Sequence, residues 1–413
     1  MSVSKIHQLL SESTTTAANS QGRPALVGLT RSVNALIYSE LVAIQETTQP
    51  TSTLFGVRYR NPNGDMAFQS MATYGGLVGS RDGITQAAAG PYVKGDIFQD
   101  TDTVVYEVLK DFTLAVTVPG TLEDAIYEAV IVGDIRIKSE SAPSQYFEQG
   151  SDIVQTDFQF DRWNAEVKSR KLKSDVTVEL MQDLEANKMD APSVVEDVLA
   201  TMISEDINKD IIQTLGTVST RFMMGDMTKP ILDLTTATDA VIIGRTLYQY
   251  VCEMKGQMQR QTSFDATYAL CSVRVGALLS ASGWLKPSSD PLADGELYNG
   301  MKVYVDAYSS FDYVVVGCKH EMNDIEHVGS LFFSPYVESD NLGSYKIVND
   351  ADSLQPHLCM MIRYGLSVNP YATGLGESDK RLTRGDDWSK LAGQSRLSYM
   401  LGVKLPKIIE PAE

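Results

Sequence analysis

The sequence predicts an α+β fold, and three features of its hydrophobic pattern support that prediction. The segment from Val194 to Leu215 has apolar residues at the spacing of a helix that packs along one face. Residues 51–173 contain short alternating segments between glycines, which is the pattern of β-strands. After Ser219, helical and extended patterns are mixed. A long helix, a strand-rich region and a mixed region together indicate an α+β protein of two or three domains.

The composition is that of a globular protein. Of the 413 residues, 43% are hydrophobic and 21% are charged, which is ample material for hydrophobic cores. The formal net charge of −18 argues against a surface that grips phosphate backbones, so we expect no sequence-specific DNA binding. The four cysteines form no C-x-x-C pair, which argues against a zinc knuckle or redox dithiol and favours folding in a reducing cytoplasm. No stretch approaches the ~18 apolar residues of a membrane helix, and we expect neither export nor a membrane partner.

The N-terminal region begins with a polar segment. Residues 11–21 are small and polar and predict a flexible arm, whereas residues 24–44 carry the apolar spacing of a helix. An arm in front of a packed helix is able to reach a neighbouring subunit. The alternative is an ordinary frayed terminus.

Residues 51–173 read as short strands around a Gly- and Ala-rich excursion. The first expected strand, which would lead out of the main body, begins at Leu54, and Asn63-Gly64 marks a turn. Residues 74–95 are rich in Gly and Ala and would form little hydrophobic core. This pattern is that of an extended loop with an inserted small domain, or of an independent β domain. The expected strands are Leu54–Arg60, Thr103–Leu109, Thr113–Val118, Glu128–Ile137 and Phe158–Leu172.

The long helix has a clear start signal. Asp190 precedes the helix, Pro192 lies in its first turn, and Ser193 with Glu196 three residues on is a capping-box pattern. At ~1.5 Å per residue, roughly 23 helical residues give a rod of about 35 Å. The polar face opposite the apolar stripe carries Glu196, Asp197, Glu205, Asp206, Lys209 and Asp210.

The region after Ser219 predicts a mixed domain. A helix is expected over Thr246–Met258, and Ser272 is expected to cap a second helix that ends near Gly283. Turn residues place Pro287–Asp294 in a surface loop. The expected strands are Thr267–Cys271, Lys302–Asp306, Tyr313–Cys318, Leu331–Ser334 and Leu358–Val368.

A search for catalytic chemistry gives little. The densest cluster of reactive side chains is CKHEMNDIEH, in which His320 and His327 are seven residues apart across an expected turn and do not aim at one metal. The glycines in GGLVGSRDG and GLGES fit neither a phosphate-binding loop nor a dinucleotide fingerprint. We therefore expect no catalytic residue, no metal ligand and no cofactor. The enzyme alternative would place a site around His320 and Glu321.

Three blocks of the sequence carry a resemblance to a known family. The run EVKSRKLKSDVTVELMQDLEANKMDAPSVVEDVLATMISEDINKDII resembles the strand and spine helix of the major capsid proteins of T-even-like myophages. The runs MKVYVDAYSSFDYVVVGCK, and FFSPYVESD with QPHLCMMIRYGLSVNPYA, resemble the closing strands of that family in the same order. The resemblance implies the tailed-phage capsid fold of the Hong Kong phage type. Its parts here would be an N-terminal arm and lead-in helix (1–48), an extended loop (49–174) with an inserted β subdomain at about 90–158, a spine helix of the peripheral domain (175–219), an axial domain around a mixed sheet (220–355), and a closing peripheral strand with the C-terminal segment (356–413).

The resemblance also implies a function. The chain would assemble with its own copies, as hexamers with pentamers as a further form, into the icosahedral capsid shell that encloses the double-stranded DNA of a tailed phage. Scaffold, portal, vertex or decoration proteins would be its other partners, and the virion, assembled in the host bacterial cytoplasm, would be its location. A pentameric vertex paralogue of the same fold is the nearer alternative. A soluble enzyme is the more distant one.

Two further expectations depend on this function. The basic residues Lys168, Arg170, Lys171 and Lys173 form the one positive run of an acidic chain and are candidates for contact with an acidic edge of a neighbouring subunit, although many such runs are only solvated faces. Leu10-Ser11-Glu12 fits the cleavage pattern that the resemblance implies for the family's maturation proteases, so cleavage is expected after Glu12, and a chain that is not processed is the alternative.

Overall fold

The computed structural model describes most of the chain beyond the N-terminal region. The described residues are 37–60, 85–100, 105–116, 120–137, 157–175, 179, 182, 191–225, 227–236, 239–262, 264–322, 326–336, 344–349 and 356–406. The predicted arm at 11–21, the cleavage position after Glu12 and the turn at Asn63-Gly64 lie outside them. So do residues 24–36 of the predicted lead-in helix and Asp190 of the predicted cap.

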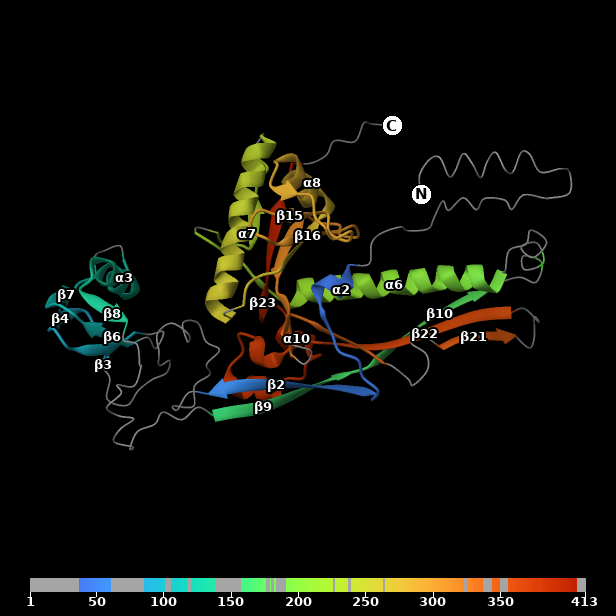
Figure 1. Ribbon diagram of the computed structural model, residues 1–413, viewed down its shortest axis with the longest axis horizontal. Coiled ribbons are helices and arrows are strands. Elements are labelled where there is room, and N and C mark those ends of the chain that lie inside the picture. The colour runs from blue at the N-terminus through green and yellow to red at the C-terminus, as the bar shows by residue number, and fades with distance from the viewer. Residues whose placement is uncertain are drawn as a thin grey trace.

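The longest helix lies along a five-stranded sheet (Figure 1). Helix α6 (Ala191–Val218) crosses above β10 (Lys168–Asp175) and β22 (Pro356–Ser367), which pair antiparallel from Lys168↔Tyr364 to Asp175↔His357. Strand β10 is at the edge of this sheet. The order is β1-β20-β22-β10, with β21 also paired to β22; the remaining strands are β1 (Ala43–Ile44), β20 (Phe332–Pro335) and β21 (Ser344–Asn349).

The apolar stripe of α6 faces this sheet, as its spacing predicts. Leu199, Ile203, Ile207, Ile211, Ile212 and Leu215 are buried in one core with Leu358, Met360, Tyr364 and Leu366 of β22. The stripe is narrower than the sequence predicts, because Val198 is 39% and Met202 is 53% exposed. Burial of one helix stripe against one sheet face holds this layer together.

A mixed sheet forms the second large core. Strand β13 (Tyr268–Ser272) pairs parallel with β16 (Lys302–Asp306) and antiparallel with β17 (Tyr313–Gly317), while α7 (Ala240–Thr262) and α8 (Val273–Ala281) pack against the sheet. The order is β11-β23-β17-β13-β16-β15-β14, and β12 also pairs with β23; the other strands are β11 (Ser219–Arg221), β12 (Ile231–Asp233), β14 (Leu285–Lys286), β15 (Gly295–Leu297) and β23 (Ser395–Lys404).

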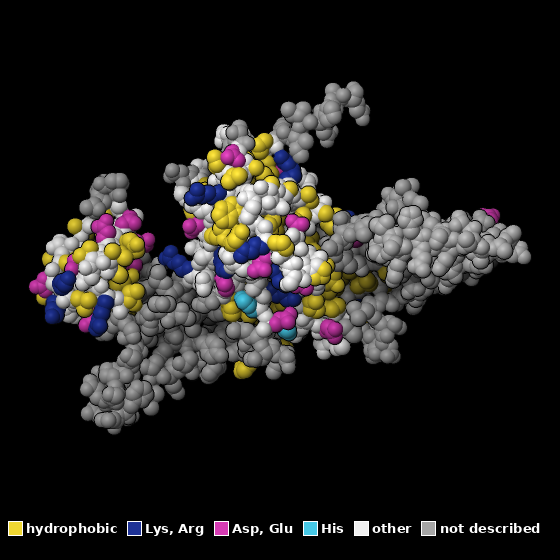
Figure 2. Space-filling model, turned by 45° about the horizontal axis from the view of Figure 1, so that its top comes forward, with side chains coloured by type: hydrophobic (Ala, Val, Ile, Leu, Met, Phe, Trp, Pro, Cys, Tyr) yellow, Lys and Arg dark blue, Asp and Glu magenta, His cyan; other side chains and the backbone are white. Residues whose placement is uncertain are grey.

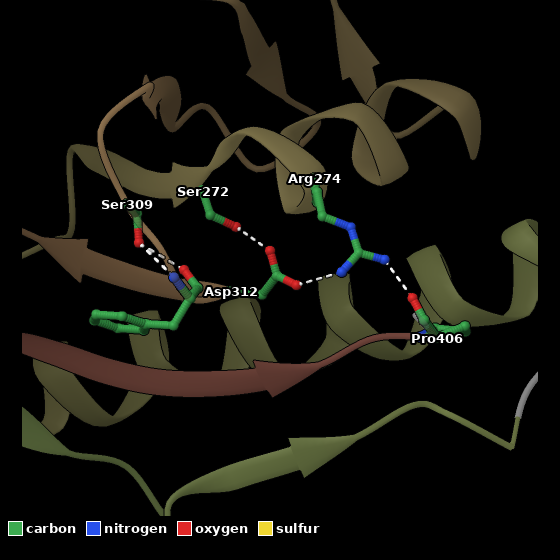
Figure 3. Close-up of polar contacts among 6 residues, drawn as sticks. Ser272, Arg274, Ser309, Asp312 and Pro406 are labelled. Carbon is green, nitrogen blue, oxygen red and sulfur yellow. Dashed lines mark hydrogen bonds and ion pairs between the residues drawn. The ribbon is translucent and has the colours of Figure 1, made fainter. Parts of the chain in front are cut away.

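Polar contacts fix the end of β23 to this domain (Figure 3). The Oγ of Ser272 donates to Asp312 at 3.0 Å, and Arg274 donates to the other carboxylate oxygen at 2.9 Å. The second Nη of Arg274 donates to the carbonyl of Pro406, just beyond β23. Short helices precede this strand: η1 (Pro370–Ala372), α9 (Glu377–Leu382) and α10 (Trp388–Leu391).

A two-stranded ribbon and a small subdomain extend from these cores. Strands β2 (Thr51–Arg60) and β9 (Asp157–Glu166) pair antiparallel over their whole length and form no other sheet. The inserted subdomain has a core of its own around Phe98, Tyr106 and Ile126 and lies beyond the end of the ribbon (Figure 1). Its elements are β3 (Thr85–Gln86), β4 (Gly90–Tyr92), β5 (Ile97–Gln99), β6 (Val105–Val108), β7 (Phe112–Leu114), α3 (Leu122–Val132) and β8 (Ile135–Ile137).

The strand predicted over Glu128–Ile137 is wrong for most of its length. Residues 122–132 form α3, because Thr121 and Asp124 make a reciprocal capping box at its start. Gly133 ends the helix with φ 85°, a left-handed conformation that glycine adopts without strain. Only Ile135–Ile137 is a strand.

Two other predicted elements have different limits. The helix predicted through Ile44 ends at Leu41, since α2 (Tyr38–Leu41) is followed by extended Val42 and by β1, which pairs with Phe332 and Phe333. The strand predicted over 158–172 is two strands, β9 and β10, separated at Val167. The division of the whole chain into the family's domains stays a prediction.

Candidate assembly surface

The predicted contact residues lie on β10, where the strand register divides them between two faces. Side chains alternate along a strand, so Lys168, Arg170 and Leu172 share the face that carries α6. Lys171 and Lys173 share the opposite face, and both are exposed. The basic run is therefore not one patch.

Arg170 is held inside the chain by α6. Its guanidinium pairs with the carboxylates of Asp206 and Asp210, the second at 3.0 Å. The Tyr364 hydroxyl donates to the same Asp210 carboxylate at 2.7 Å, and the Arg170 Cζ lies 5.7 Å from the centre of the Tyr364 ring. Burial, aided by the bond to Asp210, raises the pKa of Tyr364, so its hydroxyl keeps its proton and donates even in alkaline solution. Arg170 thus joins the helix to the strand, and a contact with a neighbour stays a prediction for the three lysines.

The face of the sheet away from α6 is positively charged. Lys171 lies opposite Met361 and Lys173 opposite Cys359, and Arg363 follows on the same face of β22. The guanidinium of Arg363 stacks on the Tyr336 ring at 4.4 Å from its centre. We call Lys171, Lys173 and Arg363 the basic sheet face. It combines a fixed guanidinium with two exposed ammonium groups in a chain of net charge −18.

A second surface lies on the β2–β9 ribbon. Leu54 and Trp163 face one side of the ribbon and pack with Phe332 and Ala43, whereas Phe55 and Phe160 face the other side and are 68% and 75% exposed. No function was predicted for these two rings. The sequence signal for them is in TSTLFGVR and FQFDRWNAE, where large apolar residues fall on both faces of the expected strands. A strand pair with one face in solvent would have polar residues on that face.

The comparison with known proteins identifies the family. A family model described as "Major capsid protein Gp23" matches residues 19–403, a range that includes the ribbon, β10 and α6. The chain belongs to the Gp23 capsid protein family. The "Capsid vertex protein" of Enterobacteria phage T4 is 43% identical to it over 426 residues, which cover 98% of this chain and 99% of the relative. The "Major capsid protein" of the same phage is 26% identical over 416 residues, which cover 88% and 78%.

The comparison with solved structures returns phage capsids. The capsid protein of Myoviridae phage XM1 covers 92% of this chain and 96% of its own length, at 8% identity and a TM-score of 0.43. Gp23 family members and their relatives are structural proteins of the virion shell. The resemblance read from the sequence is confirmed at the level of this family.

The enzyme alternative places a site at His320 and Glu321, which lie in the hairpin of β18 (Lys319–Met322) and β19 (Glu326–Gly329). His320 lies opposite Val328 and His327 opposite Glu321, so the two imidazoles belong to opposite faces of the hairpin. His320 Nε2 is 3.0 Å from the carbonyl of Asp265. Within the described ranges, no group of three or more His, Cys, Asp or Glu side chains is placed to hold a metal ion. The hairpin therefore does not bring its histidines to one site.

A cavity of 550 Å³ beside this hairpin contains three lysines, and each of them is paired. Lys255 lies 3.1 Å from Asp265, Lys302 lies 2.9 Å from Asp290, and Lys319 lies 3.4 Å from Glu321. These pairs neutralise the three ammonium groups. None of the helices in the described part of the chain is long and apolar enough to cross a membrane.

Proposed function

We propose that this chain is the subunit of the pentamers at the vertices of a tailed-phage head. The observation that supports this proposal is the 43% identity to a capsid vertex protein over nearly the whole of both chains, against 26% identity to the major capsid protein of the same phage. The hexamer-forming role has its own support, because the matching family model is described by the major capsid protein. Both roles use the same shell fold.

The structure suggests how copies are held in register. Subunits of net charge −18 repel each other unless opposite charges meet locally. The basic sheet face, with Lys171 and Lys173 exposed on the edge strand, offers such a place to an acidic edge of the next copy. Contacts of this kind set orientation, weaken as salt rises, and gain strength by repetition around a closed ring.

The remaining parts of the proposal follow the family. The shell would enclose double-stranded DNA without reading its sequence and would be assembled in the host bacterial cytoplasm. Scaffold, portal, major shell and decoration proteins would be its partners. Cleavage after Glu12 is part of the proposal, and the intact mass of the protein from virions tests it, because a chain that begins at Met1 would exclude the cleavage.

Particle composition and ring symmetry test the vertex role. Purified chain, alone or with its scaffold, should form rings with fivefold symmetry in electron micrographs, and the protein should be a scarce band in purified virions. Sixfold rings and an abundant band would instead establish the hexamer role. A chain that stays monomeric and is absent from particles would overturn both.

The basic sheet face has its own test. Changing Lys171→Glu together with Lys173→Glu should lower the yield of rings, and the loss should shrink as salt is added. Arg381→Glu together with Lys390→Glu, at exposed positions on α9 and α10, changes the net charge by the same amount and should leave the yield unchanged. Equal yields for all three proteins would remove the basic sheet face from the contact.

A further inference from the structure

Helix α3 of the inserted subdomain exposes apolar side chains. Ile126 and Ala129 of this 11-residue helix are buried in the subdomain core, at 2% and 7% exposure. On the other side, Tyr127 and Ile131 are 67% and 68% exposed and lie one turn apart, and Val132 beside them is 67% exposed. An amphipathic helix on a solvated surface normally has polar residues there, so a large apolar group at this position indicates a binding surface.

Acidic residues flank this apolar group. At 100° per residue, Glu123 and Glu128 lie on either side of Tyr127 and Ile131 on the exposed face. Figure 2 shows acidic and hydrophobic side chains beside each other on the surface of this subdomain. We call Tyr127, Ile131 and Glu128 the α3 face. Its partner should be apolar at the centre and positive beside it.

The β2–β9 ribbon has a surface of that description. Phe55 lies opposite Arg162, and Phe160 is the diagonal neighbour of Phe55 two residues along β9, so all three side chains are on one face. The two rings are 68% and 75% exposed, and Arg162 is exposed too, with no ion pair to another described residue. We call Phe55, Phe160 and Arg162 the ribbon face.

The two faces do not meet within one copy. Helix α3 packs against β7 and β8 of its own subdomain. Figure 1 shows α3 on the upper side of that subdomain and the ribbon to the lower right of the subdomain. A second copy is therefore needed to bring one face against the other. Two different faces on each copy make a head-to-tail contact, which closes into a ring when the rotation between copies is right.

We propose that the α3 face of one copy docks on the ribbon face of the next copy around the capsomer. Tyr127 and Ile131 cover Phe55 and Phe160, and Glu128 pairs with Arg162. This inference rests on the proposed function, because it assumes neighbouring copies of the chain. It goes further by naming both faces of one contact and by requiring that the contact be heterologous.

Single substitutions on each face test the apolar part. Phe160→Ser should raise the concentration of full-length chain needed for half-maximal ring formation about tenfold, since one buried aromatic anchor contributes on the order of a factor of ten. Tyr127→Ser should act alike. Leu382→Ser is the control, because this side chain is 77% exposed and lies on neither face. All three positions are exposed in the monomer, so its unfolding midpoint should not move, and sedimentation with circular dichroism measures both properties.

A charge exchange tests the pairing. Arg162→Glu should raise the half-maximal concentration about tenfold, and adding Glu128→Arg in the same chain should restore the wild-type value. Arg381→Glu, at an exposed position of α9, is the control for net charge. Restoration requires that the two residues meet, whereas an additive double variant would overturn the proposed contact.

Cross-linking in assembled particles gives a result that does not depend on ring formation by purified protein. Tyr127→Cys combined with Phe160→Cys should yield a covalent ladder on oxidation of rings or virions, and each single variant should not. A ladder from Phe160→Cys alone would show ribbon against ribbon and would overturn the proposal. If wild-type chain enters particles while the double variant gives no ladder, the docking fails and the shell function stands. If wild-type chain neither forms rings nor enters particles, the proposed function fails as well.

Discussion

The guanidinium of Arg170 on β10 lies 3.0 Å from the carboxylate of Asp210 on α6. The sequence presents these residues as parts of two separate features, a basic strand and the polar face of a long helix. In the structure they neutralise each other, and the Tyr364 hydroxyl completes the group from β22. Each partner is about one third exposed, so the pair is better shielded from solvent than a surface ion pair. It fixes the helix on the sheet edge.

Removing this group should loosen α6 from the sheet. Arg170→Met keeps most of the aliphatic contact and leaves Asp206 and Asp210 without their counter-charge. We expect a loss of about 1–2 kcal/mol in the free energy of unfolding, between the values of exposed pairs and of buried charged hydrogen bonds. Denaturant unfolding followed by circular dichroism measures it. Lys171→Met, one position further on the solvated face, should change stability by less than about 0.5 kcal/mol, and equal losses would contradict the proposed role of Arg170.

Gly317 is a position where any side chain should be costly. A Cβ built on Gly317 would lie 2.3 Å from the hydroxyl and ring carbon of Tyr268, which is paired with it on β13 and is 1% exposed. Since the ring is buried in the core, Gly317→Ala should destabilise the chain by about 2–3 kcal/mol. Gly90→Ala is the control, because a Cβ there has no atom within 4 Å. Comparable denaturation midpoints for the two variants would show that the Tyr268 ring moves freely.

Much of the fold is accessible from the hydrophobic pattern, and the exceptions have definite causes. The buried stripe of α6 and the strand Lys302–Asp306 have the predicted positions, since one buried helix face leaves a clear period and a strand buried on both faces leaves a short apolar run between turn residues. Helix α3 was predicted as a strand over Glu128–Val132 because its exposed face is apolar, which removes the helical period. The capping pair Thr121 and Asp124 was the signal that identifies it.

The candidate contact surfaces were predicted less completely than the fold. The basic run is visible in the sequence, but only the pairing of β10 with β22 and α6 shows that Arg170 faces inward and the two lysines Lys171 and Lys173 face outward. The central strand β23 is absent from the predicted elements, because its place between β17 and β11 depends on contacts with residues far away in the chain. Such pairings are decided by tertiary structure rather than by local propensity.

Acid should weaken the link between β12 and β23 through Asp233. The side chain of Thr235 donates to the Asp233 carboxylate at 2.6 Å and lowers the pKa of Asp233 from 3.8 to about 2, with help from the Thr235 amide and Lys404. Because folding lowers the pKa of Asp233, its carboxylate stabilises the folded chain at pH values above the ordinary pKa of an aspartate. This contribution disappears as the pH falls from about 4 toward 2.

Thr235→Val tests this acid dependence. The difference in denaturation midpoint between wild type and variant should be constant above about pH 5 and should shrink as pH falls below about 4. Thr246→Val is the control, since the Thr246 hydroxyl donates to a backbone carbonyl, that of Ile242, at 3.0 Å and no carboxylate is involved. A difference for Thr235→Val that stays constant down to about pH 2 would show that Asp233 gains nothing from this threonine.

The Asp312 carboxylate should control the order of the C-terminal end of β23. It accepts hydrogen bonds from Ser272 and Arg274, and the backbone carbonyl of the same residue accepts from the Val403 amide at 2.9 Å. Its side chain is 15% exposed, so Asp312→Ala leaves the buried Ser272 hydroxyl without its acceptor and removes the counter-charge of Arg274, and it should cost about 1–3 kcal/mol. Arg274 then also loses the partner that holds it against the Pro406 carbonyl. Amide exchange at residues 403–405 should accelerate more than exchange in β13, whereas Asp379→Ala on α9 should leave both unchanged. Uniform acceleration across the mixed sheet would instead mean that Asp312 supports the whole domain rather than the end of one strand.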